Sequence, residues 1–155
     1  MSAVPEFGDG TLGRIETEVA LLMRLGEATR RATGAREHRV LDRAAYVILR
    51  HLADAGPRNV SALAARLNLD GSTVTRQVTA MERAGLITRA ADPRDGRGTV
   101  VSPTDAGLDR VAAVRAARTR LYGDILAGWS AEDRTALAGM LERLNSALAA
   151  HVQRR

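Results

Sequence analysis

The sequence has no cysteine, no lysine and few aromatic residues. Without cysteine the chain forms no disulfide, holds no thiolate-bound metal and senses no oxidant through a thiol. Aromatic residues make up only 3% of the chain, so leucine, alanine, valine and isoleucine must fill the core, which favours helices. No run of about 18 apolar residues occurs, and the first residues lack the parts of a signal peptide. We therefore expect a single helical domain of 155 residues that is cytoplasmic and has no membrane partner.

Arginine supplies all of the positive charge that the basic side chains of this sequence carry. All 23 basic residues are arginine, the net charge is +5 and the sequence pI is about 11. Arginine binds phosphate through a planar fork of donors, so this charge fits a nucleic-acid partner. No glycine-rich phosphate loop and no serine placed beside a plausible histidine and aspartate occur. The chain is therefore expected not to be an enzyme and to need no cofactor, and its three widely spaced histidines predict no metal site.

Hydrophobic periodicity predicts helices at both ends of the chain and a mixed region between them. Leucine-rich faces at helical spacing run from Leu12 to Leu22 and from Leu137 to Leu148, and a further helix is expected from Arg36 to Ala55. Two short helices follow, within residues 59–69 and 72–85, and are joined by a tight turn. Their start signals are Asn59 or Ser61 for the first helix and Asp70 or Ser72 for the second. This order is the helix-turn-helix pattern.

After Gly85 the pattern changes to that of strands. The segments "LITRA" and "GTVVS" flank a turn rich in proline, aspartate and glycine, which predicts a β-hairpin. Ser102, followed by Pro103, is expected to begin the next helix, and Ser130 the last one. A hairpin directly after a helix-turn-helix is a wing. The predicted fold class is therefore mostly α with a small β-hairpin wing, flanked by N- and C-terminal helices.

The wing and the second short helix carry the candidate DNA contacts. A helix fits the major groove of DNA, and a narrow minor groove attracts arginine from a hairpin tip. We expect Arg97 or Arg94 to enter the minor groove and Arg89, at the base of the wing, to meet a phosphate. Asp92 and Asp95 are expected to hold the arginines and cap the turn backbone. On the helix the candidates are Ser72, Thr73, Thr75, Arg76, Thr79 and Arg83, with Gln77 nearer the boundary.

Residues 41–107 closely resemble the MarR family of winged-helix regulators. The likeness is carried by Leu63-Ala64, Leu67, Thr73-Val74-Thr75-Arg76, Met81-Glu82, Gly85-Leu86-Ile87, the wing pattern Asp92-x-Arg94-Asp95-x-Arg97, and Thr104-x-x-Gly107. The resemblance implies a homodimer formed by the terminal helices, bound to a palindromic operator in double-stranded DNA. It further implies a transcription repressor that a small, commonly anionic and aromatic, effector releases. By position, Thr73, Thr75 and Arg76 would read the major groove and Arg97 the minor groove, although Gly71-Ser72 stands where the family often has Arg-Pro.

These features predict three parts: a flexible tail over residues 1–10, a helical dimerisation region over 11–35 and 103–155, and a winged helix-turn-helix domain over 36–102. The leucine-rich end faces exceed what a lone helix can bury, which favours pairing across a two-fold axis; packing within one subunit is the alternative. Candidate effector-pocket residues, near the first two helices, are Arg14, His38, Asp42 and Tyr46.

Two other functions compete with the DNA-binding regulator. The first is a winged-helix protein-interaction module that does not bind DNA, against which the arginine-bearing wing argues. The second is a small-molecule enzyme that uses the dimer cleft, against which the missing catalytic set argues.

Overall fold

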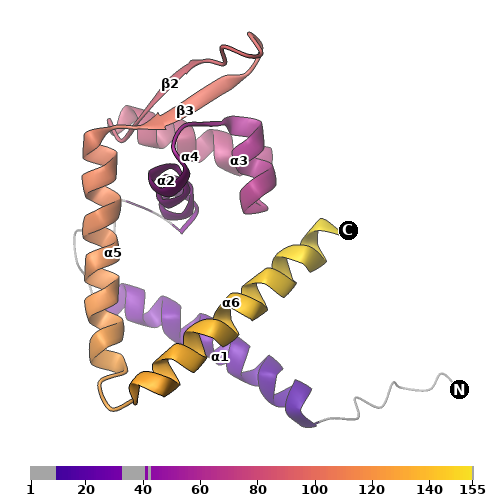
Figure 1. Cartoon of the computed structure of the whole chain (residues 1–155), viewed down its shortest axis with the longest axis vertical. Coiled ribbons are helices and arrows are strands. Elements are labelled where there is room, and N and C mark those ends of the chain that lie inside the picture. Colours follow the sequence, from indigo (N-terminus) through magenta and orange to yellow (C-terminus); the bar gives the residue numbers. More distant parts are fainter. Residues whose placement is uncertain (1–9, 33–40, 42, 155) are drawn as a thin grey trace, which may run out of the picture. The chain divides into compact units, whose positions relative to one another are not determined.

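The computed structural model describes residues 10–32, 41 and 43–154 (Figure 1). The chain separates into two compact units, residues 1–40 and 41–155. The first unit contains helix α1 (Gly10–Ala32), which matches the predicted N-terminal helix. The predicted tail of residues 1–10 lies outside the described residues, except for Gly10, which begins α1.

The second unit contains the remaining elements and has the predicted mostly helical fold with a small sheet. They are α2 (Arg43–Ala55), β1 (Arg58–Asn59), α3 (Val60–Leu67), α4 (Gly71–Arg83), β2 (Ile87–Ala91), β3 (Thr99–Pro103), α5 (Asp105–Ile125) and α6 (Ala131–Gln153). The predicted helix from Arg36 to Ala55 is wrong at Leu41, which is not helical, and α2 begins at Arg43. Residues 36–40 of that prediction lie outside the described part.

The hydrophobic core of this unit surrounds α2, which contacts α3, α4, α5 and β3 (Figure 1). Its apolar face is the one that the 3.6-residue period predicts, since Ala45, Ile48, Leu49 and Leu52 are all buried. The other elements add the buried residues Leu41, Leu63, Val74, Val78, Met81, Leu86, Ile87, Val101, Val111 and Val114. The core therefore ends at Val114, within α5, and α6 contributes no buried residue to it.

The helix-turn-helix is held by side-chain caps and one left-handed residue. The Asn59 side chain accepts a hydrogen bond from the Ser61 amide at 2.8 Å, and Asp70 accepts one from the Thr73 amide at 2.8 Å. Asn68 ends α3 in the left-handed region with φ of 51°. Asn59 and Asp70 are among the caps that the sequence analysis named, and they fix where α3 and α4 begin.

The wing is a three-stranded antiparallel sheet in the order β1-β3-β2. The hairpin of β2 and β3 agrees with the predicted strands, and Arg89 lies opposite Val101. Two-residue β1, which was not predicted, pairs with the other edge of β3.

The helix start predicted at Ser102 is wrong. Pro103 is the last residue of β3, and Thr104 caps α5 by accepting a hydrogen bond from the Gly107 amide at 3.1 Å. The Thr104 hydroxyl also donates to the Gly85 carbonyl oxygen at 2.7 Å, and the Thr104 amide donates to the Leu86 carbonyl oxygen. These bonds to the turn after α4 favour the start of α5 after Thr104. Ser130 caps α6 as predicted.

Candidate nucleic-acid interface

Helix α4 has one buried face and one open face of hydroxyls and arginines. Val74, Val78 and Met81 are buried in the core. Gln77 is also buried, with only 7% of its surface exposed, so it is not part of the open face as the structure stands. Among the predicted contact residues, Ser72, Thr75, Arg76 and Arg83 are exposed and Thr73 and Thr79 are partly exposed. The structure therefore brings all six onto one accessible helix surface.

The start of α4 is organised by the carboxylate of Asp70. The hydroxyls of Ser72 and Thr73 both donate to it, in addition to the Thr73 amide. These hydrogen bonds, led by that of Ser72, hold the pKa of Asp70 far below its ordinary value of 3.8. Asp70 thus positions the hydroxyls of Ser72 and Thr73. Helix α4 begins at Gly71-Ser72, the pair that the sequence analysis noted as a departure from Arg-Pro.

The carboxylates at the wing tip bind the turn backbone rather than the arginine side chains. Asp92 accepts a hydrogen bond from the Arg94 amide at 2.9 Å, and Asp95 accepts one from the Arg97 amide at 3.1 Å. The first of these bonds is the main reason that the pKa of Asp92 is lowered. Both aspartates therefore cap the turn backbone, and neither forms the expected ion pair with Arg94 or Arg97. The guanidinium groups of Arg94 and Arg97 form no ion pair with any described residue, and both residues are exposed.

Asn59 joins the wing to the helix-turn-helix, a role that the sequence analysis missed. Its Oδ1 caps α3, while its Nδ2 donates to Asp92 Oδ2 at 3.1 Å. A Cβ atom at Gly98 would lie 2.5 Å from that Nδ2, so Gly98 leaves the room in which the amide reaches Asp92. Asn59 and Asp92 are 33 positions apart, and the pairings of β1 and of β2 with β3 bring them together.

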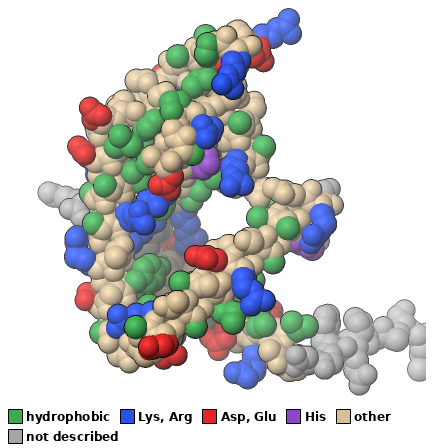
Figure 2. Space-filling view, in the orientation of Figure 1, with side chains coloured by type: hydrophobic (Ala, Val, Ile, Leu, Met, Phe, Trp, Pro, Cys, Tyr) green, Lys and Arg blue, Asp and Glu red, His purple; other side chains and the backbone are tan. Residues whose placement is uncertain are grey.

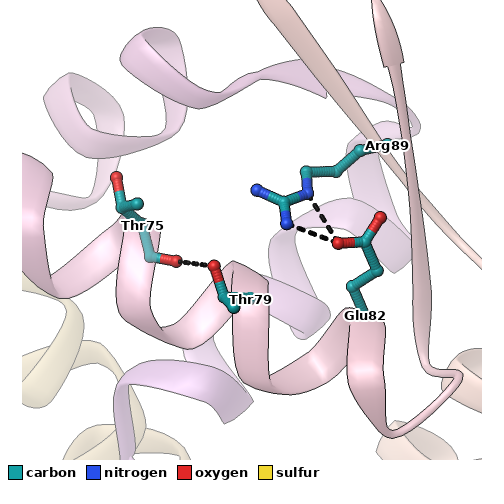
Figure 3. A network of polar contacts seen from close by, with 4 residues as sticks. All are labelled: Thr75, Thr79, Glu82 and Arg89. Carbon is teal, nitrogen blue, oxygen red and sulfur yellow. Dashed lines mark hydrogen bonds and ion pairs between the residues drawn. The ribbon is translucent and has the colours of Figure 1, made fainter.

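At the base of the wing, Arg89 of β2 is paired with Glu82 of α4 (Figure 3). Both the Nε and one terminal nitrogen of Arg89 donate to Glu82 Oε2, the Nε at 2.8 Å. This bond lowers the pKa of Glu82 and raises that of Arg89. One turn earlier, the Thr79 hydroxyl donates to the Thr75 carbonyl oxygen at 2.9 Å. The sequence analysis expected Arg89 to meet a phosphate and did not identify its contact with Glu82.

Arginines, acidic side chains and apolar side chains are interspersed over the viewed face (Figure 2). Within the described residues Arg76 and Arg83 form no ion pair, so α4 presents unpaired positive charge beside its hydroxyls. No group of three potential metal ligands occurs in the described part of the chain. None of the helices described is long and apolar enough to span a membrane.

The four candidate effector residues are not brought together by the described structure. His38 and Asp42 lie outside the described residues, and Arg14 belongs to the first unit. Tyr46 is partly buried, with the Arg118 guanidinium carbon 4.1 Å from the centre of its ring. A separate open groove of about 490 Å³ lies between α2 and α5, and Tyr46 is not among the residues that line it.

A helix-turn-helix followed by an arginine-tipped hairpin defines a winged-helix DNA-binding protein. The MarR family model matches residues 41–99. The uncharacterized HTH-type transcriptional regulator YxaD of Bacillus subtilis (strain 168) is 36% identical over 107 residues, which cover 69% of this chain and 75% of that protein. A putative transcriptional regulatory protein for the hcr operon of Thauera aromatica is 32% identical over 99 residues, 64% of this chain and 60% of that protein.

Solved structures agree with this assignment. A probable transcriptional regulator from Pseudomonas aeruginosa has a TM-score of 0.67 at 28% identity, covering 84% of this chain and 98% of that one. The PcaV regulator from Streptomyces coelicolor, in complex with its natural ligand, has a TM-score of 0.66 at 24% identity, covering 96% and 99%, and shows the shared fold. The chain belongs to the MarR family and is a DNA-binding transcriptional regulator.

Proposed function

We propose that this regulator is a cytoplasmic homodimeric repressor that binds a palindromic operator and leaves it when a small anionic or aromatic molecule binds. The observation that carries the DNA-contact part is the wing tip. There Asp92 and Asp95 accept hydrogen bonds from backbone amides, while Arg94 and Arg97 stay exposed. A stiff turn that presents unpaired arginine suits insertion into a minor groove.

The two helices at the ends of the chain support the dimer. Helix α6 has no buried residue, yet its exposed side chains include Met140, Leu141, Leu148 and Val152. Helix α1 likewise exposes Leu12, Ile15, Leu21, Leu22, Met23 and Leu25. Association of two copies through these faces removes apolar surface from water. It would also place two copies of α4 and of the wing on one duplex, with half-sites about 34–36 Å apart.

Division of labour within the interface follows from side-chain chemistry. We assign base reading in the major groove to Thr73, Thr75 and Arg76, and the minor groove to Arg97. Replacing Arg76 by alanine should weaken binding to the selected operator more than binding to a scrambled duplex. Equal losses on both duplexes would reduce Arg76 to a phosphate contact.

The groove between α2 and α5 offers a place for an anionic effector. Its lining combines Leu108 and Val111 with the arginines Arg50, Arg115 and Arg120. An apolar floor beside cationic groups suits an aromatic carboxylate. Thermal unfolding with a panel of aromatic acids tests this part, and the Arg115→Met variant should lose any stabilisation that the wild type shows.

The experiment that tests the proposal as a whole is selection of binding sites from a random duplex library. A palindromic consensus supports the function, and affinity for that consensus should fall steeply with salt, since arginine–phosphate contacts release counterions. Failure to enrich any sequence, together with no binding to duplex DNA at low salt, would contradict it.

A further inference from the structure

The ion pair of Glu82 and Arg89 links the recognition helix to the first strand of the wing. Glu82 lies in the last turn of α4, the recognition helix, and Arg89 lies in β2, the first strand of the wing (Figure 3). The segment between them turns at Gly85, whose φ is +74°. The pair therefore connects the two elements that must enter two different grooves of DNA.

Arg89 differs from the wing-tip arginines because two of its five N–H donors already bind a carboxylate. Its Nε and a terminal nitrogen both donate to one oxygen of Glu82. Release of the guanidinium toward a phosphate would leave the Glu82 carboxylate uncompensated on the same side of the molecule as the DNA. Because a carboxylate and a phosphate repel each other, a move of Arg89 to the DNA would carry an electrostatic cost.

The backbone near the pair is held at the turn after α4 and along the pairing of β2 with β3. The Leu86 amide donates to the Met81 carbonyl oxygen at 2.9 Å, and Thr104 holds the Gly85 carbonyl oxygen. These bonds fix the turn after α4, and the pairing with β3 sets the direction of β2. The side chains of Arg89 and Glu82 add a connection one strand residue beyond Thr88, on a surface where they remain 33% and 38% exposed.

We propose that Glu82 is a positioning residue of the DNA interface, which holds Arg89 and so fixes the wing relative to the recognition helix. Arg89 acts on DNA through this geometry and not as a phosphate contact. The inference rests on DNA binding by this chain and goes beyond the contacts assigned above, because it gives a role to a carboxylate, which DNA itself would repel.

The consequence is specific to operator binding. Without the pair the wing is held less firmly relative to α4 and must be ordered further when both enter their grooves, so the specific complex loses affinity. Binding to a scrambled duplex depends mainly on charge and changes less. An exposed ion pair contributes little to the stability of the fold itself, so the unfolding midpoint should move by only a small amount.

Four proteins test the proposal: the wild type, Glu82→Gln, Arg89→Met and the double variant. The probes are a duplex selected from a random library by the wild type and a scrambled duplex of equal length, titrated over a range of salt. Glu132→Gln on α6 is the matched control for loss of one exposed glutamate. Arg97→Met is the reference for an arginine that contacts DNA. Thermal unfolding of each variant checks that it is folded.

The proposal predicts that each single variant binds the selected duplex about two- to fivefold more weakly, the range of an exposed ion pair. The double variant should be no weaker than either single variant, and the slope of log K against log salt should stay at its wild-type value. Arg97→Met should instead make that slope shallower by about 1.8, since each of the two wings of the dimer loses one contact.

Several results would contradict the positioning role of Glu82. A shallower slope for Arg89→Met, or tighter binding of Glu82→Gln to both duplexes, would show that Arg89 is a phosphate contact that Glu82 restrains. Additive losses in the double variant, or losses equal on both duplexes, would also overturn the positioning role. A wild type that binds neither duplex would overturn DNA binding itself, and this inference with it.

Discussion

The winged region and the terminal helices bury their apolar residues in opposite ways. Every buried apolar residue found in the described structure lies between Leu41 and Val114. Helices α1 and α6 are each 23 residues long and expose most of their large apolar side chains. The first region completes its own core, whereas the second is stable in water only if something covers it. We infer that one region reads DNA and the other assembles the regulator.

The largest effect on stability is expected from the core of the winged region. Leu63 is fully buried, and its replacement by alanine should lower the free energy of unfolding by about 2–5 kcal/mol. Leu148→Ala, at a side chain that is 53% exposed, is the matched change on α6. Its effect should depend on protein concentration, because it acts through association. Urea unfolding at two protein concentrations separates the two cases, and equal effects would remove the contrast between the regions.

A charge on the apolar face of α6 should break the assembly without harming the winged region. Leu141→Glu is expected to give a monomer and to weaken operator binding by about 100-fold or more, because the second recognition helix is lost. Ser146→Glu, roughly on the opposite side of the same helix, serves as the control. Sedimentation and fluorescence anisotropy measure both properties. Retention of the dimer by Leu141→Glu would contradict the assigned role of α6.

The tip of the wing should contribute in the range of one good arginine contact. We expect Arg97→Ala to weaken operator binding by about 1–3 kcal/mol and to leave the dimer intact. Arg143→Ala, which removes the same charge from α6, should have little effect. Gel-shift titration at fixed salt is sufficient to compare the two variants, and unchanged affinity for Arg97→Ala would rule out its groove contact.

Asn59 allows its capping and its wing contact to be separated. Alanine removes both, whereas serine keeps a capping oxygen but cannot reach Asp92. Asn59→Ala should therefore lower stability by about 1 kcal/mol and Asn59→Ser by less. Both should speed hydrogen exchange of the Gly98 and Asp92 amides equally. Faster exchange in the alanine variant alone would show that the cap, and not the link, orders the wing.

The smallest effect is expected from acid titration at the start of α4. The pKa of Asp70 is lowered on folding, so its charged form stabilises the fold above the ordinary value of 3.8, and this contribution is lost as pH falls below roughly pH 4. Asp70→Ser keeps a capping oxygen without the titrating group. The difference in unfolding free energy between the two proteins should be constant near neutral pH and shrink in acid. A difference that grows in acid would contradict the assignment.

The sequence predicted those features that depend on neighbours along the chain. The turn at Asn68, the hairpin after Gly85 and the cap residues follow from local chemistry and periodicity. Prediction from the sequence failed for features that depend on contacts between distant residues. The Ser102 cap was wrong because Thr104 finds partners at Gly85 and Leu86, and two-residue β1 is too short to leave a pattern.

The candidate site was predicted as a set of residues but not as a network. The six candidate residues of α4 and the arginines of the wing follow from their spacing and residue type. The bonds of Asn59 to Asp92 and of Arg89 to Glu82 cross between elements, so no period in the sequence indicates them. The burial of Gln77 likewise depends on how α4 packs.

The most direct measurement is the mass of the complex between the purified chain and its selected duplex, determined by sedimentation equilibrium. Two chains per duplex, twice the chain mass of 16.6 kDa, are predicted, with free protein of the same doubled mass at micromolar concentration. One chain per duplex, or a free monomer that binds the duplex with full affinity, would contradict the division between a DNA-reading region and an assembling one.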